Sequence, residues 1–181
     1  ISNCYNTGAV TVKTEQAGGL VGQSIGVTNR NSYNNGVVNG NGAVAGGIVG
    51  FVITNANIAN SYNLNSVTAS IGAGGIVGYM YDGDNIVINA CVNQGNVTGN
   101  TQGIGGIMGF GGASGSLTIT ASTNYGTING GSAGQYVGGI IGLMQIGTIG
   151  GSSTNACYNY GKIVSAVSSS TNYNIIGRIF G

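Results

Sequence analysis

The sequence contains no histidine, proline or tryptophan, and only seven of its 181 residues carry a formal charge, four Lys or Arg and three Asp or Glu. Without histidine, the chain cannot build a Ser-His-Asp triad or a histidine-ligated metal site. Four scattered cations do not form the basic stripe that neutralises nucleic-acid phosphates. The most apolar stretch, residues 43–53, is too short to span a membrane. These absences point away from catalysis and nucleic-acid binding, and towards a structural or binding role.

The residues that are present indicate a folded chain. Glycine contributes 38 residues, apolar types make up 41% of the sequence, and the net charge is only +1. Disordered chains are usually more polar and more highly charged. The sequence starts at Ile1 and stops within a repeating pattern. We therefore expect residues 1–181 to be a single segment of a longer repeat array or a filament subunit.

One motif occurs six times, and its third residue is always asparagine. The copies are Cys4–Val10, Ser32–Val38, Ser61–Val67, Cys91–Val97, Ser122–Ile128 and Cys157–Ile163. The shared asparagines are Asn6, Asn34, Asn63, Asn93, Asn124 and Asn159, so that successive copies are 28, 29, 30, 31 and 35 residues apart. A fixed period of this length is typical of repeat architectures.

A second motif, Gly-Gly-apolar-apolar-Gly, lies between successive copies of the first. It occurs at Gly18–Gly22, Gly46–Gly50, Gly74–Gly78, Gly105–Gly109 and Gly138–Gly142, and a copy without the glycine pair follows at Tyr173–Gly177. Two independent motifs thus keep nearly the same spacing.

The period predicts an all-β parallel β-helix, or β-solenoid, of about six coils of 28–35 residues. Gly, Asn, Thr and Val are weak helix formers, and the short β-branched segments are bounded by Asn-Gly or Gly-Gly. One repeat is too small to bury its own apolar residues. Stacking coils at roughly 4.8 Å would supply both the hydrogen bonds and the core.

The two motifs resemble those of GLUG-motif repeat proteins, and the resemblance covers essentially the whole chain. Such repeats occur in large bacterial surface proteins, including adhesins, in the non-catalytic part of IgA-protease-like metallopeptidases, and in surface proteins of some protists. The resemblance implies a right-handed solenoid at the cell surface or outside the cell, with no active site within the repeats.

The asparagines and cysteines have structural interpretations. Stacked asparagine amides can bond to the coils above and below and hold a turn, which predicts an asparagine ladder rather than a sugar site. Cys4, Cys91 and Cys157 share one repeat position, which serine fills in the other copies. Coils three apart are separated by roughly 14 Å, too far for a disulfide. We therefore predict three free, buried cysteines.

The tyrosines beside the ladder leave two alternatives open. Tyr5, Tyr33, Tyr62 and Tyr158 could form an exposed aromatic stripe for glycans or stack within the solenoid. Asp82 and Asp84 are the only close carboxylate pair and the only, weak, candidates for a metal site, because the Glu that closes a calcium loop is missing downstream. We predict no catalytic residue, no cofactor and no enzyme activity.

Adjacent apolar pairs in the glycine motif suggest an interaction face. The residues are Leu20, Val21, Ile48, Val49, Ile76, Val77, Ile107, Met108, Ile140 and Ile141. Neighbours in a strand point to opposite faces, so one row should point outward onto a flat, glycine-flanked surface. We expect self-association or adjoining repeats, with a glycan or host surface as a further ligand.

Three functions fit these features. The first is a non-enzymatic extracellular adhesin, stalk or spacer. The second is a self-assembling filament subunit that stacks end to end, because open strand edges template pairing. The third is the non-catalytic repeat region of a secreted metallopeptidase.

Overall fold

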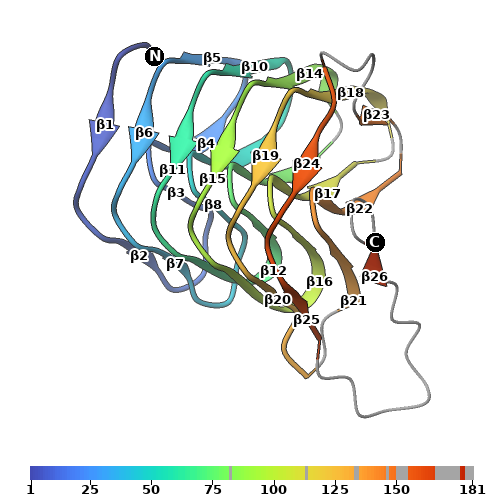
Figure 1. The fold of residues 1–181 in the computed structure, drawn as a ribbon. Coiled ribbons are helices and arrows are strands. Elements are labelled where there is room, and N and C mark those ends of the chain that lie inside the picture. The colour runs from blue at the N-terminus through green and yellow to red at the C-terminus, as the bar shows by residue number, and fades with distance from the viewer. Residues whose placement is uncertain are drawn as a thin grey trace.

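The structure is a computed structural model that describes residues 1–81, 83–112, 114–132, 135–145, 147–149, 155–165 and 176–177. These residues form strands and turns without helix, and the strands pair in parallel, so the predicted β-solenoid is confirmed (Figure 1). No helix in this part of the chain could cross a membrane. The winding hand stays a prediction.

Four sheets run along the stack, named here in chain order. Sheet I contains β1 (Tyr5–Asn6), β6 (Tyr33–Asn34), β11 (Tyr62–Asn63), β15 (Val92–Asn93), β19 (Thr123–Asn124) and β24 (Tyr158–Asn159). Sheet II contains β2 (Val10–Val12), β7 (Val38–Gly40), β12 (Val67–Gly74), β16 (Val97–Gly105), β20 (Ile128–Asn129) and β25 (Ile163–Val164), together with β3 (Ala17–Gly18), β8 (Ala45–Gly46), β21 (Gln135–Gly138) and β26 (Ile176–Gly177).

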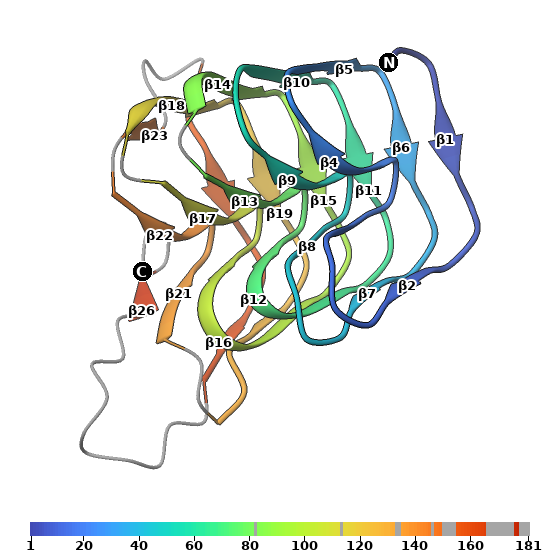
Figure 2. The same cartoon turned by 180° about the vertical axis from the view of Figure 1, so that it is seen from behind.

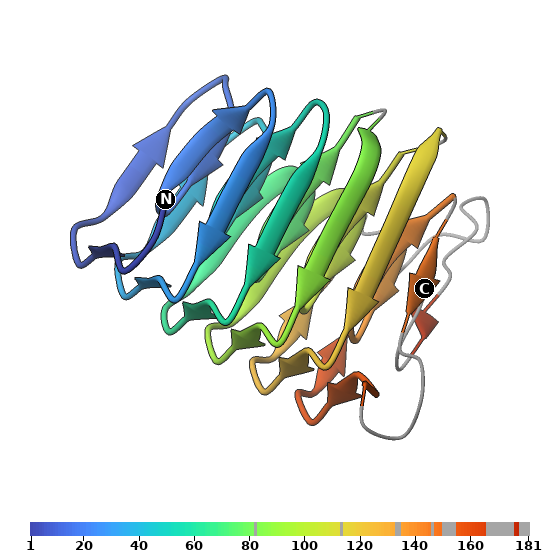
Figure 3. The same ribbon diagram turned by 90° about the horizontal axis from the view of Figure 1, so that it is seen from above.

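The other two sheets complete each turn of the chain. Sheet III contains β4 (Val21–Ser24), β9 (Val49–Val52), β13 (Val77–Met80), β17 (Met108–Gly111) and β22 (Ile141–Met144). Sheet IV contains β5 (Val27–Arg30), β10 (Ala56–Ala59), β14 (Gly83–Asn89), β18 (Gly115–Thr120) and β23 (Thr148–Ile149). Sheets III and IV are seen best from behind, and the stacked coils from above (Figures 2 and 3).

The strand register places equivalent residues of successive motifs beside one another. Asn34 pairs with Asn6 and Asn63, and Val77 pairs with Val49 and Met108. Sheet I takes one strand from each of the six asparagine motifs. The sequence period is therefore the length of chain needed to travel once around the solenoid.

The interior holds two separate apolar cores. One is built from sheets III and IV, with Ile48, Met80 and Ile119 among its buried members. The other lies within sheet II, where Val67 and Ala73 of β12 are both buried. Between the two cores, the asparagine side chains of sheet I contact the glycines at the corner where the chain passes from sheet II to sheet III. Polar amides and glycines thus form a partition across the solenoid.

The second glycine of each pair makes this partition possible. A Cβ atom at Gly75 would lie 2.1 Å from the carbonyl oxygen of Gly106 and 2.3 Å from Cγ of Asn93. The same two clashes, with the glycine above and the asparagine of the next motif, occur at Gly19, Gly47 and Gly106. The two sequence motifs are therefore in direct contact, which explains why their spacings match.

The adjacent apolar pairs are buried, so the predicted interaction face is wrong. Both members of the pairs that begin at Ile48, Ile76, Ile107 and Ile140 have no exposed surface. Leu20 and Val21, in the outermost coil, are half-buried and pack against the same core. The first member of each pair lies in the corner and the second starts a strand. Because the chain turns between them, the alternation of side chains along a strand does not apply and both point inward.

One buried amide lacks a complete set of partners. Asn29 is fully buried in β5, in register with Ile58 of β10, and its Nδ2 atom has no hydrogen-bond partner. Its Oδ1 atom lies 3.3 Å from Ser61 Oγ, but the single hydroxyl hydrogen of Ser61 is shared with the nearer carbonyl of Ala59, at 2.9 Å. An unpaired buried polar group destabilises a fold by about 1–3 kcal/mol.

We predict that Asn29→Leu raises the free energy of unfolding by about 1–3 kcal/mol. Leucine keeps the branch at Cγ, joins the apolar row of Ile58, and leaves Ser61 its bond to Ala59. Urea denaturation measures the change. Asn57→Leu, on the outward side of β10, is the control and should shift stability by less than about 0.5 kcal/mol. An Asn29→Leu variant less stable than the parent would contradict the prediction.

Candidate interaction surface

Exposed tyrosines gather on the outer side of sheet I. Among the described residues, eleven large apolar side chains have more than a third of their surface exposed, and seven of these lie here: Tyr5, Tyr33, Tyr62, Leu64, Tyr125, Tyr158 and Tyr160. We call this set the tyrosine face. It holds six of the ten tyrosines of the chain. The exposed stripe, rather than the internal stack, is therefore the arrangement that the structure shows.

The tyrosine face is built from two parallel rows. One row runs along sheet I in strict register, through Tyr5, Tyr33, Tyr62, Val92, Thr123 and Tyr158. The other follows two residues later in each coil, through Thr7, Asn35, Leu64, Gln94, Tyr125 and Tyr160. Aromatic residues occupy both ends of the face, and Val92, Gln94 and Thr123 occupy its middle.

Neighbouring rings stack along the face. The centroids of Tyr5 and Tyr33 are 5.3 Å apart, with an angle of 8° between the rings. At the other end, Tyr125 and Tyr160 are 5.3 Å apart, and Tyr158 and Tyr160 are 6.1 Å apart. Stacking in register orients the rings, so each end presents a preformed aromatic platform.

The asparagine ladder lies directly behind this face. Because successive residues of a strand point to opposite sides, an inward asparagine sends the preceding tyrosine outward. Each amide Nδ2 donates to Oδ1 of the next coil, at 2.7–2.9 Å from Asn6 to Asn124, and to a carbonyl two residues ahead. These amides hold the fold together and are not available to a ligand.

The repeat position that cysteine and serine share lies at the corner before sheet I, where its side chain contacts the backbone. Ser32, Ser61 and Ser122 each donate a hydrogen bond to the carbonyl two residues earlier, and Cys91 makes the equivalent contact at 3.4 Å. None of the three cysteines forms a disulfide, as predicted. Only Cys91 is buried, however, whereas Cys4 is exposed and Cys157 half-buried. The prediction of three buried thiols is therefore wrong for Cys4 and Cys157; Cys4 precedes β1, the edge strand of sheet I within residues 1–181.

Burial raises the pKa of the Cys91 thiol to about 12, against smaller opposing contributions from hydrogen bonds to Ser61 and Asn89. In the folded chain, we expect Cys4 to react with thiol reagents at neutral pH and Cys91 to react only after unfolding. Above the ordinary thiol pKa of about 8.5, the unfolded chain loses a proton that the folded chain keeps, so the free energy of unfolding should fall as pH rises towards 12.

Thiol labelling and urea titrations across this pH range measure both effects. Cys91→Ser should remove the contribution of Cys91 to the pH dependence of the free energy of unfolding. Cys4→Ser should leave that contribution in place. Rapid labelling of Cys91 in the folded protein would show that the coils around it open readily.

The metal-ligating residue types are dispersed over the described part of the chain. The described residues contain no group of three Cys, Asp or Glu side chains able to hold a metal ion. The candidate pair falls outside this description, since Asp82 and the side chain of Asp84 are not among the described parts.

A second aromatic row, on sheet III, was not predicted from the sequence. Phe51, Tyr79 and Phe110 stack with centroid distances of 5.3 and 4.5 Å and are half-buried. Each follows the last glycine of the second motif, which is the signal that could have identified the row. A bend of sheet II packs against it, since a Cβ atom at Gly72 would lie 3.2 Å from the Tyr79 ring.

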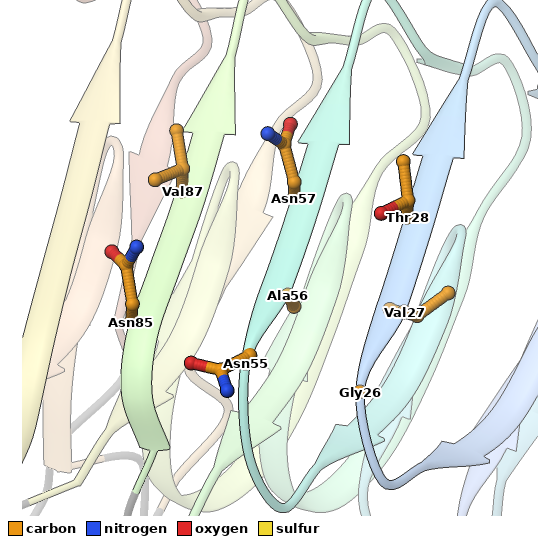
Figure 4. A pocket seen from close by; sticks show the side chains of 8 residues that line it. All are labelled: Gly26, Val27, Thr28, Asn55, Ala56, Asn57, Asn85 and Val87. Atoms are coloured by element: carbon orange, nitrogen blue, oxygen red, sulfur yellow. The ribbon is translucent and has the colours of Figure 1, made fainter.

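Sheet IV carries a shallow hollow of about 280 Å³ on its outer side. It is lined by Gly26, Val27, Thr28, Asn55, Ala56, Asn57, Asn85 and Val87, and three side-chain amides stand around it (Figure 4). These groups can donate and accept hydrogen bonds but carry no charge. The hollow is therefore a second, smaller place where a neutral ligand could be held.

Comparisons with known proteins support the fold. Neither the protein-family models nor the curated proteins give a match. Among solved structures, the chain is similar to one titled as a "putative immunoglobulin A1 protease" from Bacteroides ovatus, with a TM-score of 0.63 and 24% sequence identity. The similarity covers 97% of this chain and 59% of that one, so the chain spans little more than half the length of its neighbour. At this level of identity, the likeness shows a shared β-solenoid fold.

Proposed function

We propose that this chain is a non-enzymatic extracellular β-solenoid of the GLUG-repeat type, a rigid adhesive segment that binds its partner through the tyrosine face. The observation that carries the proposal is the concentration of exposed tyrosines on sheet I. Tyrosine is enriched at recognition surfaces because it combines a large rigid ring with a polar hydroxyl. Monomeric soluble proteins rarely expose large apolar patches, and each end of the tyrosine face gathers three exposed tyrosines.

The rest of the molecule supports a structural role for the scaffold. The polar groups that could otherwise serve catalysis or recognition, the asparagines of sheet I, are bonded to one another inside the solenoid. A scaffold of stacked coils holds the tyrosine face at fixed spacing and orientation. Such preorganisation reduces the entropy lost on binding.

A second candidate is the non-catalytic repeat region of a secreted metallopeptidase. The fold and the similarity to the Bacteroides ovatus protein fit such a region, with the peptidase activity carried by another part of the protein. In that setting the tyrosine face would bring the enzyme to its target. A filament subunit remains the third candidate, and light scattering of the purified chain tests it.

Retention on surfaces tests the adhesive role. Beads coated with the 181-residue chain should be retained on intact epithelial cells or on immobilised mucin, and a variant with Tyr33→Thr, Tyr62→Thr, Tyr125→Gln and Tyr160→Gln should lose retention. Thr123 and Gln94 already occupy these two rows, so the substituted residues suit the sheet. Tyr81→Thr is the matched control, because Tyr81 is 56% exposed but lies outside the tyrosine face. Equal retention of all three proteins would contradict the proposal.

A further inference from the structure

We infer that the ligand of the tyrosine face is a neutral polysaccharide, bound along the axis of the solenoid with one stretch of sugars on each aromatic platform. This inference rests on the proposed adhesive function and specifies the class of ligand. Tyr5, Tyr33, Tyr62 and Leu64 form the first platform, and Tyr125, Tyr158 and Tyr160 form the second.

The distribution of groups on the face fits a linear polymer better than a folded protein. Protein interfaces have an apolar centre surrounded by a polar rim. The tyrosine face has its aromatic residues at the two ends, and Gln94 and Thr123 lie between them beside a single valine, Val92. Two coil steps separate Tyr62 from Tyr125, which places the platforms about 10 Å apart. A chain molecule can contact both platforms and bond to the polar groups between them.

The chemistry of the face matches sugars. The negative face of an aromatic ring attracts the weakly positive C–H groups of a pyranose, whose ring has a similar size and shape. The exposed hydroxyl and amide groups of Thr7, Asn35 and Gln94 can bond to sugar hydroxyls. The exposed side chains of the face extend over successive coils, an arrangement that suits an extended ligand.

The charge on the face favours a neutral polymer. None of the seven charged residues lies in the strands of sheet I or in the second row of the face. The charges nearest in sequence are Arg30, on sheet IV, and Lys162, two residues after Tyr160. An acidic polysaccharide would find no cation within the face to pair with, whereas a neutral polysaccharide needs no such partner.

Affinity electrophoresis tests the assignment directly. The chain is run in gels that contain dextran, mannan or hydroxyethyl cellulose as neutral polymers, and alginate as an acidic polymer. We expect at least one neutral polymer to retard the chain and alginate to have no effect. Loss of one platform, by Tyr33→Thr with Tyr62→Thr or by Tyr125→Gln with Tyr160→Gln, should weaken binding at least tenfold, because the two sites act on one polymer. Loss of both should abolish binding, and Tyr81→Thr should bind as the parent does.

The outcomes separate this inference from the proposed function. Surface retention that depends on the tyrosines, resists periodate oxidation and is removed by protease would overturn the polysaccharide and leave the adhesive role intact. Binding to alginate alone would overturn neutrality. Binding lost in Asn57→Ala but kept by the four-tyrosine variant would assign the ligand to the hollow on sheet IV instead. Failure of every polymer to retard the parent chain would overturn the inference.

Discussion

Gly75→Ala is expected to prevent folding or to lower the free energy of unfolding by at least about 4 kcal/mol. The added methyl group would stand 2.1 Å from the carbonyl oxygen of Gly106 and 2.3 Å from Cγ of Asn93. One obstacle is backbone and the other belongs to the buried ladder, so neither can move aside without disturbing the next coil. Soluble yield, far-ultraviolet circular dichroism and urea denaturation measure the effect.

Two glycine substitutions in the first coil form a matched pair that tests this prediction. Gly19→Ala repeats the clash, at 2.2 Å from the Gly47 carbonyl, in the first coil, and we expect the later coils to stay paired with one another if that coil is disrupted. This variant gives a measurable stability if Gly75→Ala yields no folded protein. A Cβ atom at Gly8, in the same coil, meets only Oδ1 of Asn6 at 3.6 Å, an ordinary contact, so Gly8→Ala should change stability by less than about 0.5 kcal/mol. Equal effects of Gly19→Ala and Gly8→Ala would contradict the close contact.

Asn34→Ala should destabilise the fold by about 4 kcal/mol, at about 1 kcal/mol for each of four hydrogen bonds. Its Nδ2 donates to Gly36 O and Asn63 Oδ1, and its Oδ1 accepts from Asn6 Nδ2 and Gly36 N. All four hydrogen-bonding positions of this fully buried amide are thus used. Alanine leaves the partner groups unpaired, which is more costly than the loss of the bonds themselves.

The neighbouring residue is the control for the ladder. Asn35 is exposed in the second row of the tyrosine face, and its backbone contacts do not depend on its side chain. Asn35→Ala should shift the denaturation midpoint by no more than a surface substitution does, within about 0.5 kcal/mol. Unchanged stability of Asn34→Ala would mean that the amide bonds are replaced by water without loss.

The sequence period was sufficient to predict the fold. The steps of 28–35 residues between asparagines measure the length of chain around the solenoid, and the invariance of Asn6 to Asn159 indicated a ladder. Both conclusions depend only on spacing along the chain. The inward side chain of Asn63 also determines that Tyr62 points outward, which could have settled the orientation of the tyrosines once the ladder was accepted.

Other features depend on where the corners lie, which the spacing does not reveal. The chain turns between Ile76 and Val77, and this single turn places both side chains inside. The second row of the tyrosine face was missed because its residues vary from coil to coil, from Thr7 to Tyr160, so no motif marks it. The exposure of Cys4 follows from its place in the outermost coil, which a repeat pattern treats like any other position.

The hydrogen bonds of the asparagine ladder all point the same way along the axis, so the two ends of the solenoid are chemically different. Every ladder bond runs from the Nδ2 atom of one ladder asparagine to the Oδ1 atom of the ladder asparagine in the next coil, so these amide dipoles add along the axis. A two-fold symmetric contact between equivalent ends of two such stacks would set oxygen against oxygen at Asn6, or nitrogen against nitrogen at Asn159. Only translation along the axis continues the sequence of donors and acceptors. Any assembly that extends this ladder is therefore directional, with every copy facing the same way.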